Sequence, residues 1–285
     1  MKFNKHHLPD RPRAFITGAG GGLGRALALA LARRRGRMVL ADIHAERLAE
    51  SVAAVQAAGG EAVAEALDVT DAAAVERVAE AAWARWMGLD LVVNNAGVAC
   101  AGAVGEVSLA NWRWALDINL YGVIHGCHAF APRLRAQGHG AVLNVASAAG
   151  IACAPEMGPY NVGKAGVIAL SETLHAELGA AGVGVTVLCP TFFPTHLLET
   201  MRATDPRQNK LAQRMFDRAK VTADDVAAAA LHAVEAGDLY AVPQTDAKFI
   251  WALKRLVPER FYQVLTLEQR FGLSRRLSKL GRARA

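Results

Sequence analysis

Cysteine is scarce in this chain, and the few cysteines that occur are scattered. The 285 residues contain four, Cys100, Cys127, Cys153 and Cys189, and no two of them form a CxxC pair. This spacing excludes a zinc ribbon and a scaffold held together by disulfides. Each cysteine falls in an apolar segment, so we expect four buried, reduced thiols and no metal site.

Long hydrophobic runs are also missing. No segment reaches the roughly 18 consecutive apolar residues of a membrane-spanning helix. Residues 1–13 are rich in Lys, His and Arg and lack the apolar core of a secretory signal. With 53% hydrophobic and 20% charged residues, the composition excludes a disordered chain. We therefore expect a globular, cytoplasmic protein.

Excess positive charge is confined to the C-terminal region. Residues 248–285 hold ten Lys and Arg against two Glu, a net of +8, whereas the whole chain carries +6, which leaves −2 for the rest. A nucleic-acid-binding protein usually presents its cations on a recognisable module. We find no such module and expect no nucleic-acid partner.

Two kinds of segment alternate along the first 245 residues. Short runs that are apolar throughout are typical of strands buried on both faces of a parallel sheet, and longer segments have helical periodicity. We expect strands at 14–17, 38–41, 62–67, 89–94, 141–145, 183–188 and 239–242, and helices at 23–35, 45–58, 71–87, 110–136, 158–181 and 222–236. Such repeated units predict an α/β fold with a doubly wound parallel sheet of about seven strands and helices on both faces.

The same pattern predicts one domain with two appendages. We expect an N-terminal arm at 1–12, a catalytic domain at 13–245, and a basic amphipathic helical extension at 246–285. Within the domain, residues 191–220 have no clean strand and only a weak helical pattern. Because this segment follows a strand end, where open α/β sheets bind ligands, we expect it to be a substrate loop.

A glycine-rich turn joins the first expected strand to the first expected helix. It runs from Thr17 to Gly24 and reads TGAGGGLG. Glycines let backbone N–H groups approach a pyrophosphate, and the helix N-terminus adds partial positive charge. The turn therefore predicts a Rossmann-like dinucleotide site, with cofactor contacts from Gly18, Gly22, Leu23 and Gly24.

The spacing of this turn is TGxxxGxG, and further motifs follow it in a fixed order. They are the NNAG sequence at 94–97, Asn119, Ser147, and the YxxxK pair Tyr160 and Lys164. Together they resemble the short-chain dehydrogenase/reductase family over residues 13–243. Residues 190–195, PTFFPT, are similar to the family's PGxxxT sequence but carry Thr191 where glycine is usual.

The resemblance and the side-chain chemistry together predict four catalytic residues. Tyr160 and Lys164 are four residues apart and share one face of a helix. A neighbouring ammonium lowers the pKa of a phenol from its ordinary value near 10, which makes Tyr160 the expected general acid/base. The resemblance implies that Ser147 hydrogen-bonds the substrate oxygen and that Asn119 holds a water relaying protons from Lys164. Structural alternatives are a helix cap for Ser147 and an interior backbone contact for Asn119.

The preferred cofactor is NAD. Asp42 ends the second expected strand, where an acid accepts hydrogen bonds from the adenosine ribose and repels the 2′-phosphate of NADP. Arg33, Arg34, Arg35 and Arg37 lie far along the first helix and beyond it, but Arg25 follows the last glycine, so NADP stays the alternative. The resemblance implies further cofactor contacts from Asp68, Val69, Asn95, Ala96, Gly97, Tyr160, Lys164 and Thr195.

The expected substrate walls are apolar and follow Ser147 and Pro190. They contain Ile151, Pro155, Met157, Phe192, Phe193, Leu197, Leu198 and Met201, with Phe192 and Phe193 as alternative core residues. Since these walls offer no fixed charge, we expect a hydrophobic secondary alcohol or its ketone as substrate. Two other functions stay open: an NADP-dependent carbonyl reductase, and a non-catalytic dinucleotide-sensing protein.

The C-terminal extension has apolar residues at helical spacing beside its cations. One hypothesis is a helix pair that contacts a membrane surface. We prefer the alternative, in which these helices pack on the body or on a partner subunit. The resemblance also implies a homodimer or homotetramer assembled through the long helices at 110–136 and 158–181.

Overall fold

Seven parallel strands form the central sheet of the computed structural model, which describes residues 7–271. Their order is β3-β2-β1-β4-β6-β7-β9, so the direction of strand addition reverses between β1 and β4. The strands are β1 (Arg13–Thr17), β2 (Arg37–Asp42), β3 (Glu61–Ala66), β4 (Leu91–Asn94), β6 (Ala141–Val145), β7 (Gly184–Leu188) and β9 (Tyr240–Ala241). This arrangement confirms the predicted doubly wound α/β fold and creates a topological switch point at the carboxyl edge, where such sheets bind ligands.

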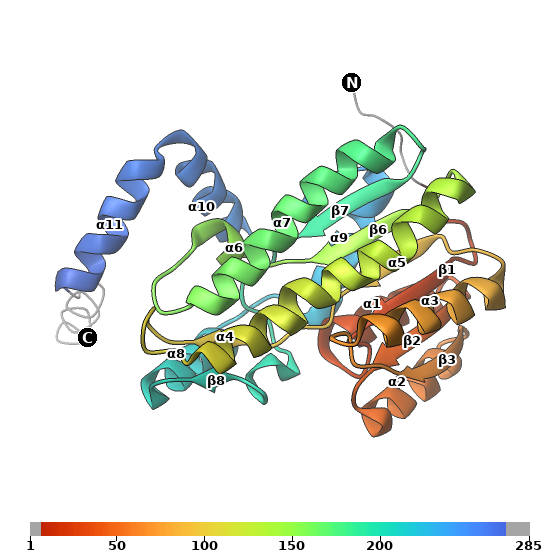
Figure 1. Cartoon of the computed structure of the whole chain (residues 1–285), viewed down its shortest axis with the longest axis horizontal. Helices are drawn as coiled ribbons and strands as arrows, with labels where there is room; N and C mark the ends of the chain where they lie inside the picture. The colour runs from red at the N-terminus through yellow and green to blue at the C-terminus, as the bar shows by residue number, and fades with distance from the viewer. Residues whose placement is uncertain (1–6, 272–285) are drawn as a thin grey trace.

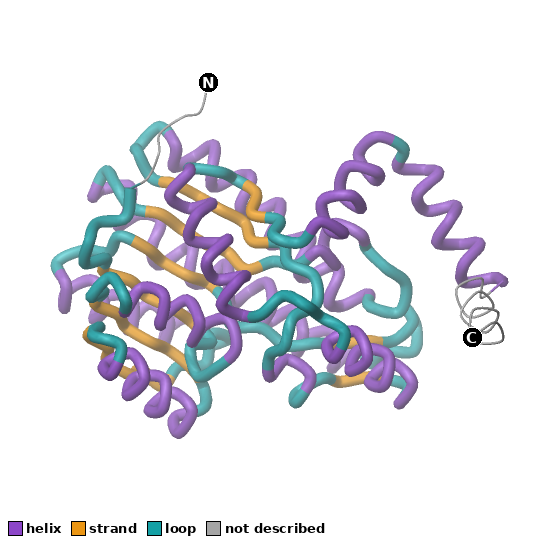
Figure 2. The backbone as a smooth tube through the Cα atoms, turned by 180° about the vertical axis from the view of Figure 1, so that it is seen from behind, coloured by secondary structure: helices purple, strands orange, loops and turns teal. Residues whose placement is uncertain are grey.

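Helices cover both faces of the sheet (Figure 1). One face is covered by α1 (Gly22–Ala32), α2 (Ala45–Ala57) and α9 (Ala223–Ala236), and the other by α3 (Ala72–Trp86), α5 (Gly122–Gln137) and α7 (Gly158–Gly179). Figure 2 shows the same layers from behind. Strand side chains alternate between two apolar cores, because successive residues of a strand point to opposite faces.

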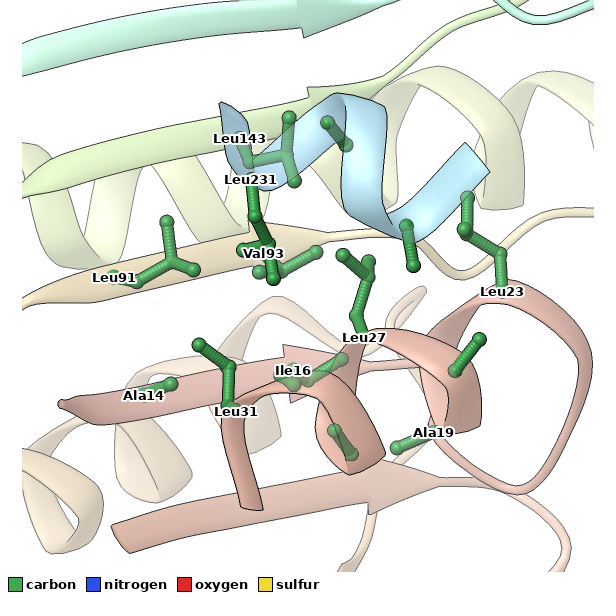
Figure 3. Close-up of a cluster of buried hydrophobic side chains, with 14 of the residues drawn as sticks. Ala14, Ile16, Ala19, Leu23, Leu27, Leu31, Leu91, Val93, Leu143 and Leu231 are labelled. Atoms are coloured by element: carbon green, nitrogen blue, oxygen red, sulfur yellow. The ribbon is translucent and has the colours of Figure 1, made fainter. Parts of the chain in front are cut away.

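The central strand β1 illustrates this alternation. Ala14 and Ile16 belong to the core under α1 and α9, which also contains Leu27 (Figure 3). Phe15 points the other way, and its ring lies 4.8 Å from that of Phe130 on α5. Every β1 residue after Arg13 is buried, which explains why the sequence has apolar runs there rather than alternation.

The single helix expected at 110–136 is interrupted. The structure has α4 (Leu109–Leu116), a π-helical turn η1 (Asp117–Tyr121) and then α5, joined without a loop. A π turn inserts one residue into the helix and is frequent at functional sites. Periodicity alone does not detect it, because the apolar pattern continues through the insertion.

Residues 191–220 are more ordered than expected. They contain a 3-10 turn η2 (His196–Leu198), a two-residue strand β8 (Arg202–Ala203) and α8 (Pro206–Asp217). Strand β8 pairs with β5 (Cys100–Ala101), about a hundred residues earlier. So short a strand leaves no local pattern. The start of α8, however, is marked by a capping box at Asp205 followed by Pro206.

The C-terminal extension begins as two helices, α10 (Thr245–Leu256) and α11 (Pro258–Phe271). Pro258 is the first residue of α11, where proline is well tolerated. Figure 1 shows α11 directed away from the sheet. The expectations for 1–6 and 272–285 lie outside the described residues. Within 7–271, no helix has the length and hydropathy needed to cross a bilayer.

Candidate active site

The glycine turn lies between β1 and α1 at the carboxyl edge of the sheet. Gly18 and Gly22 have φ values of 64° and 52°, in the left-handed region that favours glycine. A side chain at Gly24 would collide with the carbonyl oxygen of Gly18, so the helix can approach the turn only because Gly24 has none. The first N–H groups of α1 have no intrahelical acceptor and are therefore free to bind an anion.

The predicted cofactor contacts from the NNAG segment are tied directly to this turn. The backbone N–H groups of Asn95 and Ala96 donate to the Thr17 hydroxyl at 3.0 and 3.1 Å. The Asn95 side chain donates to the carbonyl oxygens of Thr17 and Gly18 at 2.9 and 3.1 Å. Thr17 thus joins the ends of β1 and β4. No role for Thr17 was predicted from the sequence, although a hydroxyl at the last position of a strand could have indicated a contact with the end of a neighbouring strand.

Asp42 lies at the end of β2, beside the turn, as expected. One carboxylate oxygen accepts a hydrogen bond from the Gly20 N–H at 2.8 Å, and the other accepts one from the His44 N–H at 2.9 Å. The side chain is therefore oriented by the backbone on both sides. A fixed carboxylate at this place suits the recognition of ribose hydroxyls.

Asp68 and Val69 follow β3, farther along the same edge. The Asp68 carboxylate is exposed and accepts from the N–H and hydroxyl of Thr70 at 2.9 and 2.8 Å. Val69 is buried, and its carbonyl oxygen lies 2.9 Å from Nδ1 of His125 on α5. These contacts fix the segment beside the sheet edge.

Tyr160 and Lys164 lie on one face of α7 and are both nearly inaccessible to solvent. The Lys164 ammonium is 5.8 Å from the centre of the Tyr160 ring. It donates a hydrogen bond of 2.8 Å to the carbonyl oxygen of Val145, at the end of β6. This bond aims the lysine at the carboxyl edge of the sheet.

Burial dominates the titration of both groups. It raises the pKa of Tyr160, and a hydrogen bond with Ser147 acts in the opposite direction. It lowers the pKa of Lys164 from 10.5 to about 8, opposed by the Cys189 thiol group. The pKa of Tyr160 is therefore raised, opposite to the lowering expected from a neighbouring ammonium, because desolvation of the phenol is the largest effect.

Ser147 takes the helix-cap position that was named as its alternative role. It precedes α6 (Ala148–Ala152), and its oxygen caps that helix by accepting from the Ala149 N–H at 3.1 Å. Its hydroxyl also donates to the Pro190 carbonyl oxygen at 3.4 Å and lies close enough to Tyr160 to lower the pKa of the phenol. The cap holds the hydroxyl beside the phenol.

Asn119 is fully buried in the π turn. Its side chain donates to the Val98 carbonyl oxygen and accepts from the Val98 N–H, both at 2.9 Å. This is the interior backbone contact named as the alternative role. A Cβ built on Gly97 would lie 2.9 Å from the Asn119 oxygen and 3.4 Å from the Lys164 nitrogen. Asn119, Gly97 and Lys164 therefore converge, and the asparagine fixes the NNAG segment beside the lysine.

The segment after β7 closes the other side of the glycine turn. The Thr195 side chain lies 3.2 Å from the Cβ position of Gly22, and the His196 ring packs against Gly21. Of the expected substrate walls, Phe193 is 8% exposed and belongs to the core under α1, whereas the Phe192 ring lies 5.7 Å from that of Phe216 on α8. Phe193 thus takes the core position given as its alternative.

Metal ligands do not gather anywhere in the part of the chain that the structure describes: no group of three His, Cys, Asp or Glu residues could hold an ion. The polar groups that the structure brings together are the backbone N–H groups of the glycine turn, the Asp42 carboxylate beside them, and Ser147 next to the buried pair Tyr160 and Lys164. These are arranged along one edge of the sheet.

Comparisons with known proteins agree with this arrangement. The family model described as short chain dehydrogenase matches residues 12–206. The chain is 35% identical over 266 residues to a protein of Mycobacterium bovis named "Probable oxidoreductase EphD", covering 87% of this chain but only 45% of that protein. It therefore spans about half the length of this relative.

Two further relatives match over most of their length. The chain is 37% identical to D-threitol dehydrogenase of Mycolicibacterium smegmatis, covering 78% of this chain and 85% of that protein. It is 32% identical, with a TM-score of 0.83, to the crystal structure of a short-chain dehydrogenase/reductase from Burkholderia phymatum in complex with NAD, covering 91% and 96% of the two chains. The chain thus belongs to the short-chain dehydrogenase/reductase family of oxidoreductases, whose cofactor is NAD or NADP.

Proposed function

We propose that the protein is an NAD-dependent alcohol dehydrogenase or carbonyl reductase acting on an apolar secondary alcohol or its ketone. The observation that carries this proposal is the grouping of three side chains on the sheet edge that also bears the glycine turn: Tyr160 and Lys164 lie one turn apart on α7, and Ser147 caps α6 close enough to Tyr160 to affect its pKa. A protein that only sensed a dinucleotide would not need buried proton-transfer groups.

The residues present fit a dinucleotide. The turn around Gly18, Gly22 and Gly24 leaves backbone N–H groups open to a pyrophosphate, and Asp42 stands where the adenosine ribose would bind. By the family resemblance, Thr195 and the 95–97 segment would contact the nicotinamide half, and Asp68 and Val69 the adenine. A bound nicotinamide ring supplies the hydride chemistry.

The chain's own side chains would move the proton. The Tyr160 hydroxyl gives a proton to the substrate oxygen during reduction and takes it back during oxidation. Ser147 donates a hydrogen bond to the same oxygen, where negative charge develops. The Lys164 ammonium lies close enough to stabilise a phenolate at Tyr160, and its bond to Val145 keeps it there. Asn119 keeps the Gly97–Val98 backbone in place beside the lysine.

Replacing Tyr160 by Phe tests the proposal. Removal of a general acid/base costs about 10²- to 10⁴-fold in turnover, so Tyr160→Phe should reduce kcat by roughly that factor while NADH binding, followed by its fluorescence, is retained. Tyr121→Phe is the matched control, because this tyrosine is half exposed and distant from Ser147 in the sequence. Equal turnover by Tyr160→Phe and the wild type would overturn the assignment.

Substrate class is tested separately with a panel of alcohols. We expect higher kcat/KM for apolar secondary alcohols than for short charged hydroxy acids, since the expected walls around Met157 and Phe192 carry no fixed charge. The opposite preference would refute the apolar substrate. An absence of turnover with every alcohol, together with tight NADH binding, would favour the sensing function.

One observation favours the second candidate, an NADP-dependent reductase. The Arg47 guanidinium lies close enough to Asp42 to interact with its charge. A cation beside the ribose site is the feature that accommodates a 2′-phosphate. Arg47 is, however, paired with Glu199, which reduces its availability.

A further inference from the structure

The two C-terminal helices differ in how they meet the body. Ala247 of α10 is buried in the apolar core on the side of the sheet that α3, α5 and α7 cover, whereas α11 buries no residue. Figures 1 and 2 both show α11 standing apart from the sheet and its covering helices. The preferred expectation was that the extension packs on the body or on a partner subunit. Within the described residues, α10 packs on the body, whereas α11 buries no residue and reaches the body at Tyr262.

We refer to helices α10 and α11 together as the C-terminal arm. Side chains of α10 and of the beginning of α11 attach this arm to the body. The Trp251 ring lies 4.7 Å from that of Tyr240, and the Arg255 guanidinium lies 5.9 Å from the Tyr240 ring centre. The Lys254 ammonium donates to the Ile151 carbonyl oxygen, and the Tyr262 hydroxyl donates to that of Ala152 at 3.4 Å. These contacts fix the direction in which α11 leaves the body.

The arm exposes apolar side chains in two stripes. On α10, Phe249 and Leu256 are 67% and 80% exposed and lie seven residues apart, on one face. On α11, Val264, Leu267 and Phe271 are 64%, 47% and 45% exposed and follow the i, i+3, i+7 spacing of one helical face. Exposed large apolar side chains gathered in this way mark an interaction surface.

Cations accompany the stripes. Lys248 and Arg255 are exposed on α10, and Arg260 and Arg270 on α11. In the sequence, residues 272–285 then contain five Lys and Arg and no acid. The rest of the chain, up to residue 247, carries −2, so the excess positive charge of the sequence lies in the same region as the exposed apolar side chains of α10 and α11.

We propose that α10 and α11 bind the surface of an anionic phospholipid bilayer. Apolar stripes on the helices enter the boundary between headgroups and acyl chains, and the surrounding cations contact lipid phosphates. A nucleic acid would use the cations but leave Val264, Leu267 and Phe271 in water. A second copy of the chain would bury the stripes, but its body is slightly negative and offers no strong anionic field to the arm.

The arm also adjoins the proposed catalytic group. A groove of about 250 Å³ between α11 and the segment after α6 is lined by Cys153, Pro155, Tyr262, Leu265, Thr266 and Gln269. Since α6 begins directly after Ser147, a bilayer bound by α11 would lie close to the segment that follows the proposed catalytic serine. This consequence rests on the proposed function, whereas lipid binding itself does not.

Vesicle flotation of the full-length protein tests the proposal. We expect binding to phosphatidylcholine vesicles containing phosphatidylglycerol, weak binding to phosphatidylcholine alone, and a loss of binding as the salt concentration rises. Arg260→Gln with Arg270→Gln should lower the partition coefficient by about 30-fold, at about 1 kcal/mol per cation. Val264→Ser with Leu267→Ser should lower it by at least about 10-fold.

Because α8 lies in the expected substrate loop, the matched control substitutions are made at α3. Arg77→Gln with Arg85→Gln, and Met87→Ser directly after α3, should leave flotation unchanged. Circular dichroism and vesicle-free turnover of each variant show that folding and the proposed activity are intact. The proposal is overturned by a wild type that does not float with anionic vesicles, by α11 variants that float normally, or by a stripe variant whose only change is from dimer to monomer in sedimentation.

Discussion

The Arg47 guanidinium lies 2.7 Å from the Glu199 carboxylate, which joins α2 to the segment after β7. The ion pair lies beside the glycine turn: Gly20 contacts Asp42 and Arg47, and the His196 ring packs on Gly21. The ion pair raises the pKa of Arg47 and lowers that of Glu199. It also determines how much positive charge faces the ribose site.

Loss of Glu199 should change cofactor preference. In Glu199→Gln, Arg47 loses its partner and becomes available to a 2′-phosphate, so KM for NADP should fall relative to NAD by about 2- to 5-fold, the equivalent of one exposed ion pair. Steady-state kinetics with both cofactors measure this ratio. Glu61→Gln, which breaks the Arg11 pair elsewhere on the surface, should not alter it. An unchanged ratio in both variants would mean that Arg47 does not reach the cofactor.

Asp42 should have the larger effect on the same selectivity. Asp42→Ala removes the carboxylate that accepts from ribose hydroxyls and repels a phosphate, so the preference for NAD should fall by about 10- to 100-fold, or 1–3 kcal/mol. Competition binding with NADH and NADPH measures it. Asp68→Ala is the control, because that carboxylate is exposed beyond β3 and is expected near the adenine, which both cofactors share. Equal selectivity in Asp42→Ala and wild type would contradict the NAD assignment.

Lys164 should make stability depend on pH. Its folded-state pKa is lowered to about 8 from 10.5, so burying the charge costs free energy below pH 8, and this cost disappears as pH rises to 10.5. Lys164→Met should therefore raise the free energy of unfolding at pH 7, by about 1–3 kcal/mol after the lost Val145 bond is deducted. The gain should shrink at pH 10. Urea unfolding at the two pH values tests this, and a gain that grows with pH would refute it.

The glycine turn predicts a contrast between two Gly→Ala substitutions. In Gly24→Ala the new methyl group collides with the Gly18 carbonyl oxygen and the Asn95 side chain, so the turn must shift and NADH affinity should fall at least about 10-fold. Gly179→Ala, at the end of α7, has nothing within 4 Å and should bind NADH normally. Isothermal titration calorimetry measures the NADH affinity of both variants. Equal affinities would show that NADH binding does not need the close approach of α1 to the Gly18 backbone.

Local chemistry explains which features were predictable from the sequence. The runs at 38–41 and 141–145 indicated buried strands because a parallel sheet covered on both faces requires apolar side chains at every position. Tyr160 and Lys164 were expected on one helical face because the spacing of four residues is a property of any α-helix. The helix at 223–236 begins after Thr222, whose capping box with Asp225 is also a local signal.

Other features depend on residues that are far apart in the sequence. Strand β8 exists only because Arg202 and Ala203 pair with Cys100 and Ala101. The π turn that holds Asn119 is stabilised by its contact with Val98, which no helical periodicity encodes. Likewise, Lys164 was expected to act on the phenol, but the carbonyl oxygen of Val145 and the surrounding burial determine its orientation and its pKa.

The sequence by itself determined which segments are strands and helices, where backbone without side chains can meet a phosphate, and that a phenol and an ammonium share a helix face. Periodicity and glycine content act within a few residues, so they can be read along the chain. Only the tertiary structure decided that Glu199 neutralises Arg47, that Asn119 fixes Gly97 beside Lys164, and that α11 stays uncovered. These outcomes depend on loop paths and on the competition between burial and charge in three dimensions.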